Sequence, residues 1–477
     1  MINPNFINSY ARLPDRFYSK SLPTKVKDPK VISINKELAQ ELGLSIEWLE
    51  SDDGIGMLSG NSMPPGSDPL AQAYAGHQFG GWSPQLGDGR AHLIGQISDS
   101  FGVNWDIQLK GSGPTPYSRH GDGRAWLGPV LREYLVSESM HHLKVPTTRS
   151  LAAISTGEII FRDGPRPAAI ITRVAQSHVR VGTFEYFSSQ GDLDAVSELM
   201  NYVIKVHYPE LETGDALGFL DSLMSRQALL ISKWLSVGFI HGVMNTDNTH
   251  VGGLTIDYGP CAFMDEYDPK KVFSSIDTAG RYAYNQQQKV IVWNLARLAL
   301  SILPLIDPVE TEAIKKAELT LGNFDKIFMK NWRELFLKKI GIKNEKKGDE
   351  ILLNDLFLEM ATSKADFTKT FRDLSRPNLG IQKISLPENM SNWISKWQNR
   401  ILQEINPLKT MLQINPVYVP RNHLIEQAIR ESLKNDFGLF NRLLSAARNP
   451  FKEAPGNQDL YLVPNDKQVV KKTYCGT

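Results

Sequence analysis

The sequence predicts an α+β fold with a strand-rich first part and a helical second part. Two observations support this prediction. Strand-like runs and turns occupy the chain up to about residue 180, whereas apolar residues at helical spacing dominate from about residue 195. This order predicts two lobes with extensions at both ends. We expect an N-terminal extension at 1–60, a strand-rich lobe at 61–182, a helical lobe at 183–305, and a helical C-terminal region with a tail at 306–477.

The individual elements follow in chain order. Residues 36–50 have apolar side chains at helical spacing, and a long Gly-, Pro- and Ser-rich loop follows them. Tyr74, Phe79 and Trp82 lie in this loop and argue against disorder. Strands are expected at 91–98, 104–110, on both sides of an Asp-Gly turn within 150–175, and as short segments within 250–257. Helices are expected at 125–144, 195–208, 220–238 and 287–303.

The charge balance and the cysteine count exclude several classes of protein. The chain of 477 residues has 53 Lys and Arg against 52 Asp and Glu, so its net charge of +1 gives no case for a nucleic-acid or membrane partner. Two cysteines, Cys261 and Cys475, are too few for a disulfide framework and fit a reducing cytosol. The first residues lack the pattern of a signal peptide. We expect a cytoplasmic monomer.

The most apolar long segment is 289–306. Asn294 and Arg297 interrupt it, and Pro304 lies near its end. This pattern favours a buried helix over a membrane span.

Two short glycine turns have the same sequence, GDGRA, at 87–91 and 121–125. Glycines allow successive backbone N–H groups to point into one concavity, which suits phosphate oxygens, and an adjacent arginine can add charged hydrogen bonds. The second copy also precedes an expected helix, whose N-terminus favours an anion. The alternative is a pair of tight turns in which Arg90 and Arg124 are merely solvated.

Two charged residues, Lys110 and Glu133, have the order found in kinases, and two arginines follow them. Lys110 ends a strand candidate, and Glu133 lies in the middle of the next expected helix. In kinases a strand lysine holds nucleotide phosphates and is itself held by a helix glutamate. Arg173 and Arg180 have apolar neighbours, and both could neutralise a triphosphate. The alternatives are a Lys and a Glu that never meet, and two structural ion pairs.

A later stretch has the spacing of a kinase catalytic loop. Small-molecule kinases read His-Gly-Asp, four residues and then Asn, and this chain reads His241-Gly242-Val243, four residues and Asn248. An Asp-Tyr-Gly turn begins at Asp257, as a variant of the Asp-Phe-Gly metal turn. The side-chain oxygens of Asn248 and Asp257 are suitable ligands for Mg²⁺ or Mn²⁺. The alternative is an ordinary loop Asn and turn Asp.

The position of the usual base holds Val243, which cannot accept a proton. Asp247 lies four residues later, beside the expected metal ligand Asn248. Two interpretations follow: a pseudokinase that binds a nucleotide without catalysis, or an enzyme with a different geometry of attack. The presence of Asp247 favours the enzyme, because an inactive site needs no replacement carboxylate.

The stretches that contain these motifs resemble the selenoprotein O family, also called the YdiU family, a group of protein adenylyltransferases. The resemblance covers most of the chain and implies a bilobal protein-kinase-like fold. The matching stretches are 8-NSYARLPDRFY-18, 70-LAQAYAGHQFGGWSPQLGDGRA-91, 106-DIQLKGSGPTPYSRHGDGRA-125, 132-REYLVSESM-140, 146-PTTRSLA-152, 240-IHGVMNTDNTHVGGLTIDYGP-260, 414-INPVYVPRNHL-424 and 446-AARNPFKE-453.

The resemblance also implies an activity. ATP would bind in a flipped orientation that presents its α-phosphorus, and AMP would pass to a Ser, Thr or Tyr hydroxyl of a protein, including this protein itself, with release of pyrophosphate. Some members of the family use UTP with Mn²⁺, so a uridylyltransferase is an alternative. The implied base is Asp247, and the implied metal ligands are Asn248 and Asp257. The implied nucleotide-binding residues are Gly87, Gly89, Arg90, Lys110, Asp122, Gly123, Arg173, Arg180 and Asp257, with Glu133 as the ion-pair partner of Lys110.

The C-terminal tail departs from the family pattern. Members of the family often end in a redox-active Cys or selenocysteine, whereas this chain has a single thiol there, Cys475. A disulfide between Cys475 and Cys261 and an inert Cys475 remain as alternatives.

Overall fold

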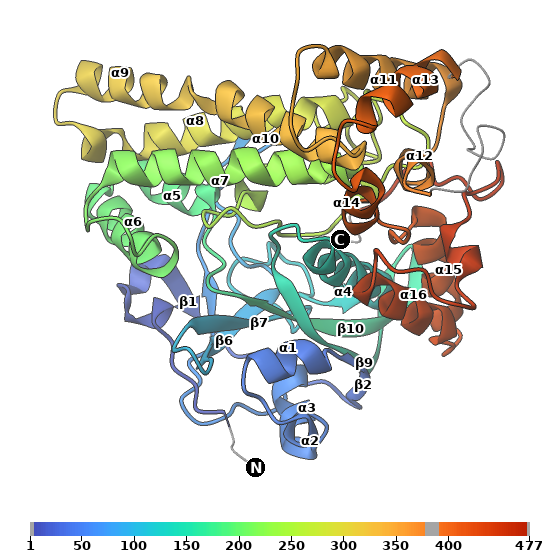
Figure 1. Ribbon diagram of the computed structural model, residues 1–477. Coiled ribbons are helices and arrows are strands. Elements are labelled where there is room, and N and C mark those ends of the chain that lie inside the picture. The colour runs from blue at the N-terminus through green and yellow to red at the C-terminus, as the bar shows by residue number, and fades with distance from the viewer. Residues whose placement is uncertain (1–3, 377–390, 475–477) are drawn as a thin grey trace.

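The computed structural model describes residues 4–376 and 391–474, and it combines one large antiparallel sheet with many helices (Figure 1). The strand order of the sheet is β1-β3-β6-β7-β10-β9-β2, and β8 pairs with β10 beside this path. Most strands precede residue 180 and helices dominate after it. This arrangement is compatible with the predicted α+β class. The two-lobed kinase-like arrangement and the domain limits remain predictions.

The strands of the sheet are β1 (Tyr18–Lys20), β2 (Lys30–Ile34), β3 (Leu70–Gln72), β6 (Ala91–Ser98), β7 (Asn104–Lys110), β8 (Ala125–Trp126), β9 (Arg149–Arg162) and β10 (Gly164–Ala175). Two small hairpins pair β4 (Gly76–Gln78) with β5 (Gly81–Ser83), and β11 (Phe239–Ile240) with β12 (Ala262–Phe263).

The helices before residue 240 are α1 (Lys36–Glu41), α2 (Ile46–Leu49), α3 (Asp52–Ser59), α4 (Leu127–His142), α5 (Val181–Ser189), α6 (Leu193–His207) and α7 (Ala216–Ser236). Those after it are α8 (Gln287–Ile306), α9 (Glu310–Leu321), α10 (Phe324–Lys339), α11 (Asp349–Ser363), α12 (Phe367–Leu374), α13 (Ser391–Ile401), α14 (Pro407–Ile414), α15 (Asn422–Ser432) and α16 (Gly438–Arg448).

Helix α4 lies at the centre of the sheet-rich region. Strands β9 and β10 pack against it on one side, and helices α15 and α16 contact it as well (Figure 1). Almost every residue of α4 is therefore buried, including the acids Glu133 and Glu138. Buried carboxylates need charged or hydrogen-bonding partners. Arg149 supplies them for Glu138 at 2.8 Å, and the partners of Glu133 lie in the cavity described below.

The other face of the sheet packs against α1, α2 and α3 (Figure 1). Leu38, Trp48 and Leu49 from these helices share a hydrophobic cluster with Ile107 and Leu109 of β7. Because both faces of the sheet are covered, the end of β7 is held rigidly. Lys110 is the last residue of that strand.

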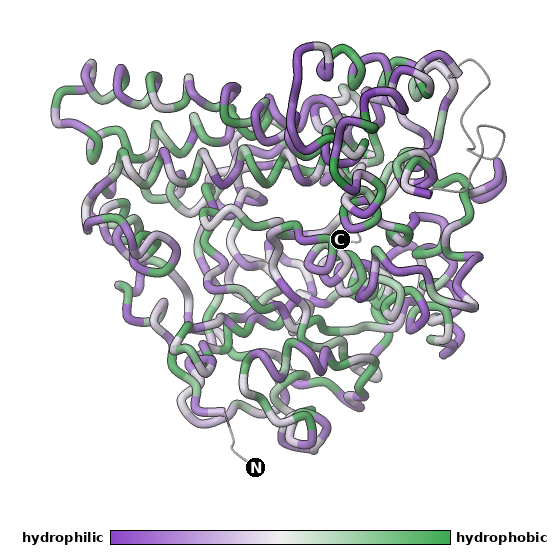
Figure 2. Tube along the Cα trace, viewed as in Figure 1, coloured by the Kyte–Doolittle hydropathy of each residue, from purple (hydrophilic) through white to green (hydrophobic). Residues whose placement is uncertain are grey.

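Helix α8 lies within the helical region. With the turn before it, Tyr284–Ile306 is long and apolar enough to cross a membrane, and it is the one such helix among the described residues. It packs against α5, α7 and α9. Along these helices hydrophobic and hydrophilic residues alternate (Figure 2). Both observations agree with the predicted buried helix.

The observed elements match the predicted ones closely, with two differences. Strands β6 and β7 coincide with the predicted 91–98 and 104–110. The predicted helix at 36–50 is two helices, because Gly43 takes a left-handed conformation (φ +70°) between them. The short strands predicted within 250–257 were wrong: only isolated bridges occur there, at His250 and Thr255, and the paired strands are β11 and β12.

Candidate active site

A cavity of about 590 Å³ opens where the loops of the sheet-rich region meet the segment 243–260. Its volume lies in the range of ordinary small-molecule sites. All of the site residues predicted from the sequence line it: Gly87, Gly89, Arg90, Lys110, Asp122, Gly123, Glu133, Arg173, Arg180, Asp247, Asn248 and Asp257. The structure therefore brings the predicted set together, although their roles remain predictions.

Lys110 and Glu133 form the expected ion pair, with Nζ and Oε2 2.8 Å apart. Arg173 binds the other oxygen of the same carboxylate. Burial opposes ionisation of Glu133, but Arg173 and Lys110 outweigh it and lower the pKa of Glu133. The interpretation of a Lys and a Glu that never meet is excluded by this geometry.

Asp257 binds all three cations of what we call the cation cluster, which consists of Lys110, Arg173 and Arg180. Its Oδ1 lies 3.0 Å from Lys110 Nζ and also accepts a hydrogen bond from Arg173, and its Oδ2 lies 2.8 Å from Arg180. Burial raises the pKa of Asp257, but the cation cluster dominates and holds the pKa well below its usual value. Asp257 also has a left-handed backbone (φ +62°), which an Asp adopts at modest cost.

Asp247 lies in a 3-10 turn, Thr246–Asn248, that follows β11. Its backbone carbonyl accepts a hydrogen bond from Arg180 (2.8 Å), and its Oδ2 accepts one from Gln78 Nε2 (3.0 Å). Its other oxygen, Oδ1, is buried and has no hydrogen-bond partner in the described part of the chain. Burial raises the pKa of Asp247 to about 6, although Gln78 and Arg180 act in the opposite direction.

The side chain of Asn248 is held by the backbone of Val243, because Asn248 Nδ2 donates a hydrogen bond to the carbonyl oxygen of Val243 (3.0 Å). No hydrogen bond to its side-chain oxygen is formed within the described residues. Asn248 and Asp257 both line the cavity. Asn248 has a neutral amide oxygen and Asp257 has charged carboxylate oxygens, and both are ligand types that Mg²⁺ and Mn²⁺ prefer.

The residues present therefore fit a divalent ion held by few protein ligands. No group of three or more His, Cys, Asp or Glu side chains in residues 4–376 and 391–474 could form a closed metal cage. Mg²⁺ commonly binds through one or two protein oxygens plus substrate phosphates, which agrees with the pair found here.

The two GDGRA turns differ in their arginines. Arg124 does not face solvent: it is buried and donates to the carbonyl oxygens of Thr24 and Lys25, and it pairs with Glu158 at 3.0 Å. It therefore has a structural role that neither interpretation anticipated. Arg90 lines the cavity and is half-buried.

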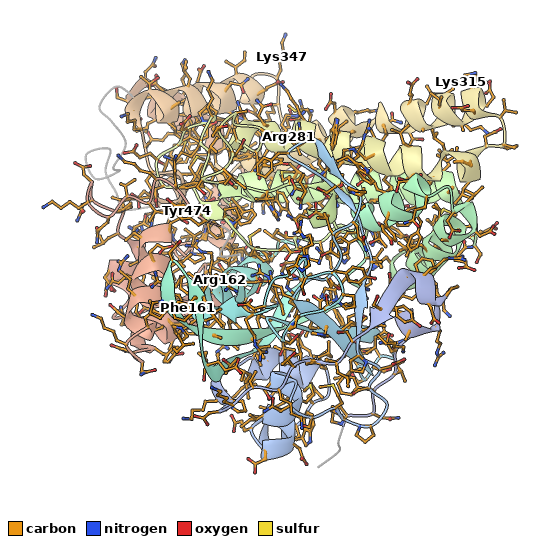
Figure 3. The ribbon with its side chains drawn as sticks, turned by 180° about the vertical axis from the view of Figure 1, so that it is seen from behind. Phe161, Arg162, Arg281, Lys315, Lys347 and Tyr474 are labelled. Carbon is orange, nitrogen blue, oxygen red and sulfur yellow. The ribbon has the colours of Figure 1, made fainter. Side chains whose placement is uncertain are left out.

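The second turn is fixed by a residue that sequence reasoning missed. Arg162, at the end of β9, donates to both carboxylate oxygens of Asp122 (2.8 and 2.9 Å) and lowers the pKa of Asp122 through these bonds. Gly123 has a left-handed backbone (φ +66°), and a Cβ there would lie 2.0 Å from the backbone of Gly113. Arg162 and Tyr474, which both line the cavity, are labelled in Figure 3.

Asp88 was also missed, although it lies inside the first GDGRA turn. It is buried, accepts hydrogen bonds from the Gln72 backbone and the Gln108 side chain, and lies 3.7 Å from Arg180. Its position between two predicted phosphate-binding glycines was the available signal. Asp88 ties that turn to the cation cluster.

The β4–β5 hairpin forms another wall that no motif had indicated. Gln78 and Phe79 line the cavity beside Asp247. The ring of His77 packs against Trp82 and Trp293, with centroids 4.8 and 5.2 Å apart. Among the described residues, this hairpin supplies the one side-chain hydrogen bond to the carboxylate of Asp247.

The two cysteines lie near the end of the Asp-Tyr-Gly turn and at the end of the tail. Cys261 is buried just after the Asp-Tyr-Gly turn, and Cys475 lies outside the described residues. Thr473, two residues before Cys475, forms an isolated β-bridge with Ser274, and its hydroxyl donates a hydrogen bond to the carbonyl oxygen of Pro260. The tail therefore reaches the cavity, where Tyr474 contributes to the lining.

Comparison with known proteins gives a consistent result along the whole chain. A family model described as protein adenylyltransferase SelO matches residues 1–448. The protein nucleotidyltransferase YdiU of Rhizobium meliloti (strain 1021) is 50% identical over 486 residues, which cover 99% of both chains. The proteins of the same name from Rhizobium etli (strain CIAT 652) and Ruegeria sp. (strain TM1040) are 49% and 48% identical, covering 99% of this chain and 97% and 99% of theirs.

Proposed function

Because this chain belongs to the SelO family of protein nucleotidyltransferases, we propose that it transfers AMP from ATP to Ser, Thr or Tyr hydroxyls of proteins. The observation that supports this most directly is the position of Asp247, which lines the cavity that also contains the cation cluster. We propose further that the two parts of the fold form the lobes of a kinase-like architecture, and that the protein acts in the cytoplasm.

The cation cluster would bind the phosphates. Lys110, Arg173 and Arg180 converge on one side of the cavity from β7, β10 and the start of α5. Glu133 and Asp257 hold these side chains in fixed orientations through ion pairs. A phosphate chain that enters would meet cations already oriented, which reduces the entropy lost on binding.

A divalent metal ion held by Asn248 and Asp257 would neutralise phosphate charge when bound. The chain's own residues prepare that position. Asp257 is kept ionised by the cation cluster, and Asn248 is turned by its bond to Val243.

Asp247 would act as the general base. The acceptor hydroxyl gives its proton to the carboxylate of Asp247 while its oxygen bonds to the α-phosphorus, and the bond from that phosphorus to pyrophosphate breaks. A carboxylate with a pKa raised to about 6 is a stronger base than an ordinary aspartate and is still mostly ionised at neutral pH.

Incubation with labelled ATP tests this proposal. With Mg²⁺ or Mn²⁺ and a mixed protein lysate, we expect label from α-labelled ATP to become bound to protein, and none from γ-labelled ATP. Intact-mass measurement of the purified protein should show gain of AMP if it modifies itself. Transfer of the γ-label alone would indicate an ordinary kinase, tight ATP binding without transfer would indicate a non-catalytic protein, and transfer from α-labelled UTP alone would indicate a uridylyltransferase.

Gly76 should be essential for this transfer, because its backbone lies against the proposed base. A Cβ on Gly76 would lie 2.6 Å from Asp247 Oδ1, so Gly76→Ala must displace either the hairpin or the carboxylate. A 1 Å misplacement of a reacting group costs about 100-fold, so we expect Gly76→Ala to lower the rate at least tenfold. Gly81→Ala is the matched control, because its Cβ would approach nothing closer than 3.4 Å. Equal rates for the two variants would contradict this prediction.

A further inference from the structure

The β4–β5 hairpin is attached to the residues that immediately precede Asp247. The backbone N–H of His77 donates to Thr246 Oγ1 (2.7 Å), and that of Phe79 donates to Asn245 Oδ1 (3.1 Å). Tyr282 donates to the same Asn245 oxygen (2.6 Å) and so supports the second attachment. The hairpin and the turn that carries Asp247 are therefore held in a fixed relation to each other.

Gln78 lies between these two attachment points. Its neighbours on both sides are bonded to residues 245 and 246, so its side chain starts from a fixed backbone. Its Nε2 lies 3.0 Å from Asp247 Oδ2. Strand β4 and Asp247 are 169 residues apart in the sequence, so this contact is set by the tertiary fold.

The two oxygens of Asp247 have different environments. Gln78 binds Oδ2, whereas the buried Oδ1 has no hydrogen-bond partner among the described residues. Arg180 binds only the backbone carbonyl of Asp247 and therefore does not fix the rotation of the carboxylate. The terminal torsion of an aspartate is intrinsically broad, so an external donor is needed to select one orientation.

We propose that Gln78 is a positioning residue that binds Oδ2 of Asp247 and thereby fixes the rotation of the carboxylate that accepts the proton of the acceptor hydroxyl. This inference rests on the proposed function of Asp247 as the base. It assigns a role to the stretch 74-YAGHQFG-80, in which Gly76 leaves room for Oδ1 and Gln78 holds Oδ2. Donors that lock a reacting group in place affect the chemical step rather than substrate binding.

The test is a double-mutant cycle. Gln78→Leu removes the donor at similar volume, and we expect kcat for AMP transfer to fall about 10- to 100-fold while ATP affinity by calorimetry stays within about twofold. In an Asp247→Asn background the same change should cause no further loss, because the group that it positions has been inactivated. Gln85→Leu, at an exposed position in the following loop, is the matched control and should retain the wild-type rate.

A second variant keeps the inference falsifiable if Gln78→Leu is unstable. Gln78→Glu has nearly the same shape but an ionised Glu cannot donate, so it should lose activity to a similar extent. Wild-type kcat in either stable variant, or an equal further loss in the Asp247→Asn background, would overturn the positioning role. If the wild-type protein transfers no AMP, or if Asp247→Asn is fully active, the proposed function fails instead, which separates the two results.

Discussion

Asp247→Asn is expected to reduce AMP transfer by about 100- to 10,000-fold, the range for loss of a general base. The substitution keeps the size of the side chain but removes its ability to accept a proton. Asp247 makes no contact with the cation cluster through its carboxylate, so ATP binding should be preserved. Rates with α-labelled ATP and affinities by calorimetry would measure the two quantities separately.

The matched control for this change is Asp194→Asn, which alters an exposed carboxylate on α6. It should leave both rate and affinity unchanged. If Asp247→Asn transferred AMP at the wild-type rate, Asp247 would not be the base and the proposed mechanism would be wrong.

Lys339→Met is expected to give the largest gain in stability. Lys339 ends α10 and is 2% exposed, with its ammonium group over the rings of Phe371 and Phe367 at 4.4 and 5.8 Å. No ion pair with this lysine occurs in the described residues. Burial lowers the pKa of Lys339 to about 7. Folding at neutral pH therefore has to bury or neutralise an ammonium group that is charged in the unfolded chain, and this reduces the free energy of unfolding. Removing that cost should raise the free energy of unfolding by on the order of 3 kcal/mol.

The gain should depend on pH in a defined direction. Between about pH 7 and the ordinary lysine pKa of about 10.5, the unfolded chain holds the proton and the folded chain does not, so the stability of the wild-type protein rises with pH through this window. Lys339→Met lacks this dependence. Its advantage should therefore be greatest at or below pH 7 and smaller by about 2 kcal/mol at pH 9.

Urea unfolding of both proteins at pH 7 and pH 9 measures this difference. Lys338→Met, which alters the neighbouring partly exposed lysine that pairs with Glu334, should change stability by less than about 0.5 kcal/mol. A constant difference between the wild-type protein and Lys339→Met at the two pH values would contradict the lowered pKa.

Some parts of the site could be predicted because local patterns encode them. Lys110 ends an alternating strand that is bounded by turns, and Asn248 and Asp257 lie at the spacing of a kinase loop. Each of these signals is contained within a short stretch. The structure accordingly brings Lys110, Glu133, Asn248 and Asp257 to one cavity.

Other parts depend on contacts between distant segments, for which a single sequence has no pattern. Gln78 meets Asp247 from a short hairpin in a Gly-rich loop, and Arg162 reaches Asp122 from the end of β9. Arg124 had the same local sequence as Arg90, yet its partners are backbone carbonyls near residue 25. The prediction of short strands within 250–257 was wrong for a related reason. The strand that precedes this segment, β11, pairs with residues 262–263, which lie beyond it.

The sharing of Asp257 by three cations has a thermodynamic consequence. ATP would draw the cation cluster toward its phosphates and leave the negative charge of Asp257 poorly neutralised. A divalent ion at Asp257 would instead repel the same three cations, which would then need another anion nearby. Each ligand therefore relieves an electrostatic penalty that the other creates. The two should bind with positive cooperativity, and linkage requires that each strengthens the other by the same factor.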